Sequence, residues 1–181
     1  MFVWVRKIAV FVTAIALAMA PQIALAQETE ATEAQAFLVT PLSFQKQIDL
    51  DFGQIIASNN NGTVVMNSAG TVSTTGGIVH ISGTQQPARF WGFGTFNQIV
   101  SINVDANAYT LTRQGGSDTI IMDQILIGSQ PPINITTNPR RFRIANPDGF
   151  FSFTIAGRLQ VGANQVPGVY SGEFTVSLEY E

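Results

Sequence analysis

The sequence predicts an all-β protein, an antiparallel sandwich of about nine short strands. Two observations carry this prediction: apolar residues alternate with polar ones at a period of two in most segments, and 16 glycines and eight prolines interrupt them at short intervals. A third observation agrees, because no long window places apolar residues three and four positions apart, as an amphipathic helix requires. Short strands separated by turns are typical of a sandwich.

The first 26 residues have the pattern of an export signal. Arg6 and Lys7 supply positive charge, residues 8–19 are apolar except for Thr13, and Ala24-Leu25-Ala26 fits the small-residue cleavage rule. Twelve apolar residues fall short of the roughly 20 that cross a bilayer as a helix. We therefore expect cleavage after Ala26, no membrane span afterwards, and a location in the periplasm, at the cell surface or outside the cell.

Residues 27–41 form a predicted flexible leader ahead of the domain, which spans residues 42–181. The stretch from Gln27 to Ala36 has no large apolar residue, so ordering it would not be repaid by burial. Phe37, Val39, Leu42 and Phe44 then begin an apolar pattern. This pattern makes residues 37–44 a candidate donor strand for another molecule.

The strands of the domain are expected in nine segments. Turn residues separate them, for example Asn61-Gly62, Gly76-Gly77, Gly115-Gly116 and Pro131-Pro132. The expected segments are residues 42–52, 63–66, 78–81, 88–93, 99–104, 109–112, 120–127, 151–161 and 170–180.

The last segment shows the clearest separation of faces. One face carries five large apolar or aromatic residues, and the other carries serine, threonine and glutamate. Such a strand either closes a sheet or offers its edge to another chain. We interpret the apolar face as an assembly edge, formed by Tyr170, Phe174, Val176, Leu178 and Tyr180.

Composition excludes several kinds of protein. Cleavage after Ala26 leaves 155 residues, which is ample for one domain, with seven basic against twelve acidic residues and a net charge of −5. This balance argues against a nucleic-acid partner. The chain has no cysteine, which excludes disulfides and thiolate metal sites.

Few residues suggest chemistry, and we predict no catalytic residue, no cofactor and no metal site. His80 is the one histidine, and it is expected to face solvent, opposite Val79 and Ile81. Asp49 and Asp51 share the polar face of one strand, where carboxylates are usually only solvated. The aromatic residues are expected in the core before any ligand site, namely Trp91 and Phe90, Phe93, Phe96, Phe142, Phe150, Phe151 and Phe153.

Three arginines form the one basic cluster, Arg140, Arg141 and Arg143. Guanidinium groups bind carboxylates and phosphates, so the cluster is a candidate anion contact. A solvated loop is the alternative.

Several motifs resemble a known family. They are Leu50-Asp51-Phe52-Gly53, Gly62-Thr63-Val64-Val65, Ala88-Arg89-Phe90, and the run from Pro167 to Val176. Together they resemble a bacterial secreted-domain family defined only as a domain of unknown function, which is similar to spore coat protein U and to the fimbrial subunits of chaperone-usher systems. The resemblance covers residues 42–180 and implies an immunoglobulin-like, pilin-like fold, export, and assembly by donor-strand complementation, with no catalytic residue.

The leading hypothesis is therefore a non-enzymatic structural subunit of a bacterial surface appendage or coat. Its partners would be like subunits or a periplasmic chaperone, joined by strand addition. Two alternatives stay open: both ends of the domain pair within one self-complete sandwich, or the domain is a binding module for carbohydrate or another anionic ligand. An enzyme is the least favoured reading.

Overall fold

The fold is known from a computed structural model that describes residues 33–128 and 131–181. The predicted signal, residues 1–26, and residues 27–32 of the leader lie outside the described residues. Residues Leu38–Glu181 form one compact unit. Every strand pairing in it is antiparallel, and the described residues include no helix, so the all-β prediction is confirmed.

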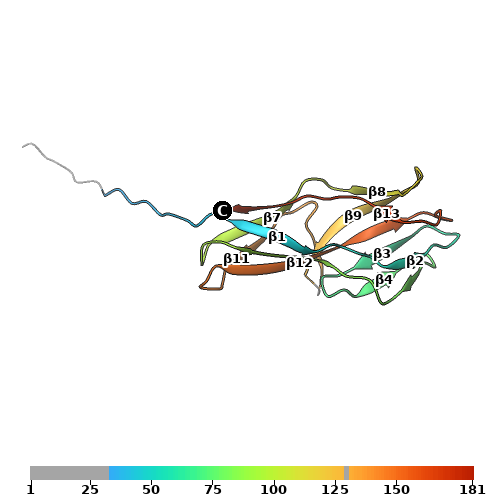
Figure 1. Ribbon diagram of the computed structural model, residues 1–181, viewed down its shortest axis with the longest axis horizontal. Coiled ribbons are helices and arrows are strands. Elements are labelled where there is room, and N and C mark those ends of the chain that lie inside the picture. The colour runs from blue at the N-terminus through green and yellow to red at the C-terminus, as the bar shows by residue number, and fades with distance from the viewer. Residues whose placement is uncertain (1–32, 129–130) are drawn as a thin grey trace, which may run out of the picture. The chain divides into compact units, whose positions relative to one another are not determined.

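The largest sheet forms one layer of the domain (Figure 1). Its main path runs, in spatial order, through β1 (Ser43–Ile48), β6 (Ala88–Phe93), β12 (Phe150–Val161), β9 (Thr119–Ile127), β8 (Tyr109–Arg113) and β13 (Tyr170–Ser171). Three further strands attach to this path, β3 (Gly62–Met66) on β12, β4 (Val72–Thr74) on β3, and β10 (Ile133–Asn134) on β9.

Two smaller sheets complete the fold. The first has three strands, β11 (Arg140–Arg143), β7 (Ile99–Val104) and β14 (Val176–Tyr180), with β7 in the middle. The second is a two-stranded ribbon of β2 (Gln54–Ile56) and β5 (Val79–Ile81).

Strand β12 organises the large sheet because it is long enough to pair with three others. Residues 150–155 pair with β6, residues 155–160 with β9, and residues 158–161 with β3. The ladder to β9 shifts register after Arg158, which leaves Asp123 as an extra residue in β9, a bulge. The carboxylate of Asp123 accepts two hydrogen bonds from Arg158, at 2.9 and 2.6 Å, and these bonds lower the pKa of Asp123.

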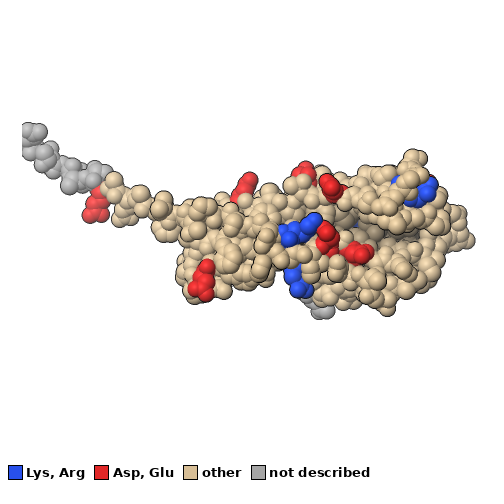
Figure 2. All heavy atoms as spheres, viewed as in Figure 1, with Lys and Arg blue, Asp and Glu red and all other residues tan. Residues whose placement is uncertain are grey.

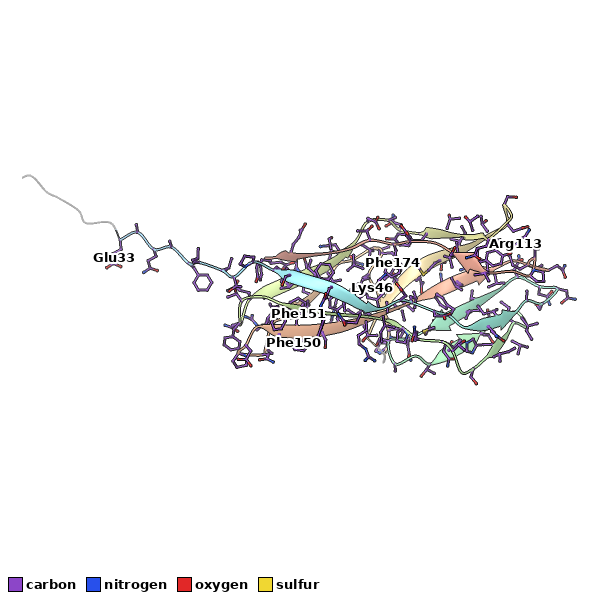
Figure 3. The ribbon with its side chains drawn as sticks, viewed as in Figure 1. Glu33, Lys46, Arg113, Phe150, Phe151 and Phe174 are labelled. Atoms are coloured by element: carbon purple, nitrogen blue, oxygen red, sulfur yellow. The ribbon has the colours of Figure 1, made fainter. Side chains whose placement is uncertain are left out.

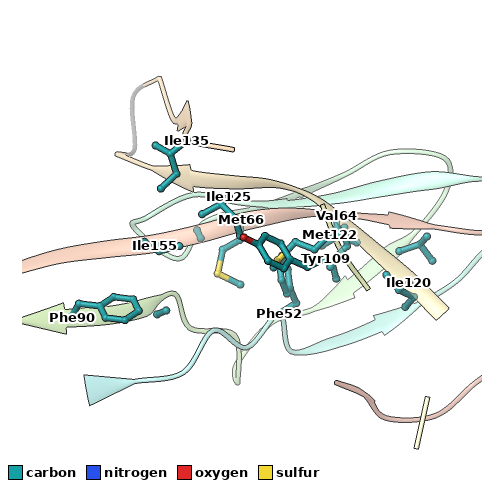
Figure 4. Close-up of a cluster of buried hydrophobic side chains, with 14 of the residues drawn as sticks. Phe52, Val64, Met66, Phe90, Tyr109, Ile120, Met122, Ile125, Ile135 and Ile155 are labelled. Atoms are coloured by element: carbon teal, nitrogen blue, oxygen red, sulfur yellow. The ribbon is translucent and has the colours of Figure 1, made fainter. Parts of the chain in front are cut away.

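The core lies between the sheets and consists mainly of aliphatic side chains, with the rings of Phe52, Phe90 and Tyr109 among them (Figure 4). The largest fully buried side chains are Met66, Ile102, Ile125, Ile144, Ile155, Val64 and Val100. A smaller cluster of Val100, Ile144 and Phe151 continues the packing, with Leu42 and Tyr180 against it. The alternating pattern therefore decides which side chains are buried in the long strands.

The described residues form fourteen strands where the sequence predicts about nine. The segment 42–52 ends as β1 at Ile48, and the backbone then turns at Gly53, whose φ of 74° suits glycine, before β2. The segment 170–180 is also divided, into β13 and β14. Strands β4, β10 and β11 have two to four residues, which is too short for a periodic pattern to reveal them.

For three aromatic residues the expected burial in the core is wrong. Trp91, Phe93 and Phe96 are exposed, whereas Phe90 and Phe151 are buried as expected. Strand β6 carries apolar residues on both faces, so its pattern cannot say which face is buried. Gly92 decides it, because a Cβ atom at this position would collide with the carbonyl oxygen of Ser43 on β1.

Replacing Ile155 with alanine tests the position of the core. Ile155 is fully buried in the middle of β12, and we expect a loss of about 2–5 kcal/mol in the free energy of unfolding. Ile121→Ala, at an exposed position of neighbouring β9, is the matched control and should cost less than about 1 kcal/mol. Denaturant titration of both variants measures the difference, and equal losses would show that the core is misplaced.

Candidate functional site: an apolar groove beside an unpaired strand edge

Strand β14 is hydrogen-bonded along one edge only. Its partner is β7, in a register that places Leu178 opposite Ile102. The Glu181 N–H donates to the carbonyl oxygen of Ile99 at 3.1 Å, and antiparallel strands alternate the direction of their amides. The amides of Val176, Leu178 and Tyr180 therefore point away from β7, and among the described residues nothing pairs with that edge.

The order of the strands shows what this edge lacks. In an immunoglobulin-like sandwich one sheet holds strands A, B, E and D, and the other holds C, F and G. The path β1-β6-β12-β9 corresponds to A-B-E-D, while β7 and β14 correspond to C and F. In the described part of the chain, no strand occupies the position of G beside β14.

Tyr170 supports this assignment. Its hydroxyl donates to the carbonyl oxygen of Val166, four residues earlier, at 2.6 Å, and accepts from Gln165 Nε2 at 2.8 Å. A tyrosine that bonds back in this way marks the corner between strands E and F in immunoglobulin-like sandwiches. The tyrosine lies between β12 and β14, which is the position that the assignment requires.

A groove of about 820 Å³ opens beside the segment that leads into β13, and no residue of β14 lines it. Residues 50–59, around β2, form one wall, and residues 164–170 form the other. Its floor is apolar and comes from the core, with Leu111, Ile120, Leu159 and Val161. Interior side chains therefore form the floor between two segments that are not hydrogen-bonded as a ladder.

The rim of the groove carries both apolar and polar residues. Ile56 and Ile81 on the ribbon and Val166 and Val169 on the opposite wall are among the exposed large hydrophobic residues of the domain. The polar lining residues are Asp51, Gln54, Ser58, Asn59, Asn164 and Gln165. Scattered apolar residues on a surface are ordinary, but a contiguous set around a cavity marks a binding site.

A hydrogen bond joins the two walls of the groove. Asn164 N–H donates to the carbonyl oxygen of Ser58 at 2.7 Å, and both residues line the groove. The end of β14 is held separately, by residues that do not line the groove. The Tyr180 hydroxyl donates to the carbonyl oxygen of Thr40 at 2.8 Å and accepts from Thr95 N–H at 2.7 Å.

The start of β14 is held by a polar contact. Asp105 Oδ1 accepts from the Tyr109 hydroxyl at 2.6 Å and from Thr175 N–H at 3.2 Å, and the Tyr109 bond is the main reason that the pKa of Asp105 is lowered. The ring of Tyr109 also packs against Phe174, at 5.8 Å between centroids. Figure 3 marks Phe174 in this segment. These contacts fix the entry of the strand whose outer edge is unpaired.

Comparison with protein families gives one match. The family model described as Domain of unknown function (DUF4402) matches residues 42–180, which is most of the chain. The chain belongs to the DUF4402 family. No curated protein matches the sequence.

The DUF4402 domain uses its predicted assembly residues in its own core. Tyr170, Phe174, Val176 and Leu178 pack against the main cluster, and Tyr180 packs against the smaller one. Each side chain is only half-buried, while the backbone edge of β14 stays open. These side chains are used within the domain, so the backbone edge of β14 is the part of the predicted assembly edge that is still open to another chain.

Of the four residues of the candidate donor segment, two pack in the domain and two are exposed. Leu42 and Phe44 pack inside the domain, and the ring of Phe44 lies 6.2 Å from that of Phe90. Phe37 is 74% exposed and Val39 is also exposed. Only residues 37–39 are free of the fold and remain candidates for donation.

The arginine cluster is largely engaged within the domain. Arg141 Nε bonds Glu181 Oε1 at 2.6 Å, and Arg143 Nη1 donates to the backbone oxygen of Asn97 at 2.6 Å. Arg140 is exposed at the start of β11. Two of the three guanidinium groups thus have a structural partner, which weakens the reading of the cluster as an anion contact.

His80 corrects a sequence expectation. It is half-buried, with Nε2 at 2.9 Å from the carbonyl oxygen of Phe52, while Val79 and Ile81 are exposed. Because a carbonyl can only accept, Nε2 carries the proton in this bond. Asp49 is paired with Lys46, and Asp51 accepts from Gly53 N–H at 2.8 Å. No group of three metal-ligating side chains occurs within residues 33–128 and 131–181.

The sequence did not reveal the groove. Its walls come from segments more than 100 residues apart, and its rim is built from loop residues such as Val166 and Val169. The available signal was the run of apolar residues in the turn before Tyr170, where a surface loop is usually polar.

The contact at the start of β14 predicts a specific pH dependence. Burial, and then the hydrogen bond to Asp105, raise the pKa of Tyr109 to about 12, whereas an unfolded tyrosine titrates near 10. The stability that this tyrosine contributes is therefore complete below pH 10 and is lost as pH rises through about 12. Unfolding free energies of the wild type and Tyr109→Phe should differ by a constant amount from pH 7 to pH 9 and converge above pH 10. A difference that stays the same from pH 10 to pH 12 would contradict the assignment.

Proposed function

We propose that this protein is a non-enzymatic structural subunit of a bacterial surface appendage or coat, and that its copies join by β-strand addition. One observation carries the proposal: a groove with an apolar floor runs between residues 50–59 and 164–170, and β14, which follows in the chain, has one edge that no strand of the described residues pairs with. A segment from a second copy would supply both the backbone partner and the apolar side chains.

The acceptor has the two features that strand addition needs. The outward amides of β14, and the segment that precedes it, can pair with an extended chain, and unpaired edges of this kind are otherwise covered or blunted. The floor of the groove offers positions for alternate side chains of that chain. The four floor residues are apolar and suit apolar side chains of the occupant, while Asp51 is the charged residue in the lining.

The donor is the segment before the domain. Phe37 and Val39 are two positions apart and lie on one face of an extended chain, while Leu38 lies on the other. The exposed side chain of Phe37 leaves water on insertion, and burying a side chain of this size contributes about 1.5–3 kcal/mol. Val39 adds a smaller amount of the same kind.

Export completes the proposal. The predicted signal would carry the chain out of the cytoplasm, where a chaperone or a like subunit could cover the groove. The described part of the chain holds no helix with the length and apolarity of a bilayer span. We propose the periplasm and the cell surface as the places of assembly.

A charge on the rim of the groove should block assembly. Ile56→Glu places a carboxylate where the donor must lie, and we expect binding of a peptide of residues 33–40 to weaken at least about tenfold. Val79→Glu is the matched control, because Val79 pairs with Ile56 across the ribbon, is 53% exposed like Ile56, and does not line the groove. Calorimetric titration of the full chain with the peptide, and size-exclusion chromatography of each variant, give the two readouts.

The peptide provides its own control. A version with Phe37→Ser and Val39→Ser keeps the length and the charge of the segment and should not bind. A full chain that stays monomeric and binds neither peptide would overturn the proposal. Equal binding by Ile56→Glu and Val79→Glu would place the contact elsewhere.

A further inference from the structure

The outer face of the large sheet carries a cluster of exposed aromatic rings. In β6 the side chains alternate, so that Trp91 and Phe93 face solvent while Phe90 and Gly92 are buried. Phe150 of β12 lies directly opposite Phe93 in the ladder. We call Trp91, Phe93 and Phe150 the aromatic platform.

The rings of the platform hold one another in place. The ring centroid of Phe150 lies 6.1 Å from that of Trp91, with an angle of 87° between the ring planes. It lies 5.5 Å from the ring centroid of Phe93, with an angle of 65°. Edge-to-face pairs of this kind are favourable because the positive edge of one ring meets the negative face of another. Figure 3 marks Phe150 beside Phe151, the neighbour that belongs to the core. The platform is thus rigid before any ligand arrives, which lowers the entropy lost on binding.

The surroundings of the platform are uncharged and polar. Gln45 and Ser152 lie on either side of Trp91 in the ladders, and Ser43 lies opposite Phe93. A depression of about 270 Å³ beside the rings is lined by Ser43, Phe44, Gln45, Trp91, Gly92 and Phe93, none of which is charged. Arg89, two positions before Trp91 on β6, does not line it. Charged side chains are also sparse over the face seen in Figure 2.

The exposed rings of the platform form a small surface. Trp91 is 39% exposed and Phe93 is 51% exposed, which together correspond to roughly 200 Å² of ring surface. A stable protein interface buries about 800 Å² on each partner. The depression is likewise smaller than most pockets for drug-sized ligands, about 300–1,000 Å³. The dimensions therefore suit a ligand of one or two small rings at a time.

We infer that the aromatic platform binds an uncharged oligosaccharide. A pyranose ring has a flat face of C–H groups, whose slight positive charge matches the negative face of an aromatic ring. Its hydroxyl groups lie at the edge of the sugar ring, where Gln45, Ser43 and Ser152 can donate and accept hydrogen bonds. No counter-charge is needed, in agreement with the uncharged lining. The platform shares no lining residue with the groove, so a subunit engaged through its groove would keep this surface.

The test uses the full chain and three neutral probes: hexamers of β-1,4-linked glucose, α-1,4-linked glucose and β-1,4-linked N-acetylglucosamine. Calorimetric titration should detect binding of at least one of them. Trp91→Ala and Phe93→Ala should each weaken that binding about tenfold or more, because each removes a stacking surface. Trp91→Tyr keeps an aromatic ring and should retain most of it.

Phe96→Ala is the matched control, because Phe96 is 50% exposed, almost as much as Phe93, but lies outside the platform. Thermal unfolding of each variant verifies that its fold is intact. The inference is overturned if no probe binds, or if Phe96→Ala weakens binding as much as Phe93→Ala. It is also overturned if Trp91→Ala leaves binding unchanged, or if this variant alters only the oligomeric state.

Discussion

The half-paired backbone of β14 is the constraint on which the rest of this structure depends. Its side chains are needed in the core, because Val176 and Leu178 pack against the main cluster and Tyr180 against the smaller one. Its backbone has hydrogen bonds on one edge only, to β7. A strand in this position must leave polar groups beside an apolar interior, unless water or another chain satisfies them. The groove lies earlier along the same stretch of chain, between residues 50–59 and 164–170.

The domain secures this strand by other means than a second neighbour. Asp105 and Tyr109 hold its start, Tyr170 holds the corner before it, and the Tyr180 hydroxyl holds its end through Thr40 and Thr95. Each of these hydrogen bonds is made by a tyrosine hydroxyl or a carboxylate, and none is a backbone bond between paired strands. The groove lies between residues 50–59 and 164–170, and of these bonds only that of Tyr170 to Val166 is made by residues that line it. Assembly and adhesion would thus use different faces, the groove for joining copies and the aromatic platform for a sugar.

The sequence could predict strands because alternation is a local property. The two faces of residues 170–180 follow from side-chain period alone, and the structure buries the expected face. Pairing is not local, and so the sequence could not say that β14 would lie beside β7 and leave its other edge free. Where both faces of a strand are apolar, as in β6, the pattern is silent, and the close approach of β1 over Gly92 places Trp91 outside. His80 was misassigned for a related reason, since β5 has three residues and its facing is set by the bond to Phe52.

Residue-resolved hydrogen exchange of β14, measured on the full chain with and without the peptide of residues 33–40, tests the central claim most directly. The amides of Val176, Leu178 and Tyr180 should exchange rapidly in the isolated subunit, while those of Ser177 and Glu179, which face β7, should be protected. The peptide should then slow exchange at the three outward amides. Uniform protection along β14 before any peptide is added would contradict the account, because the edge would already have a partner.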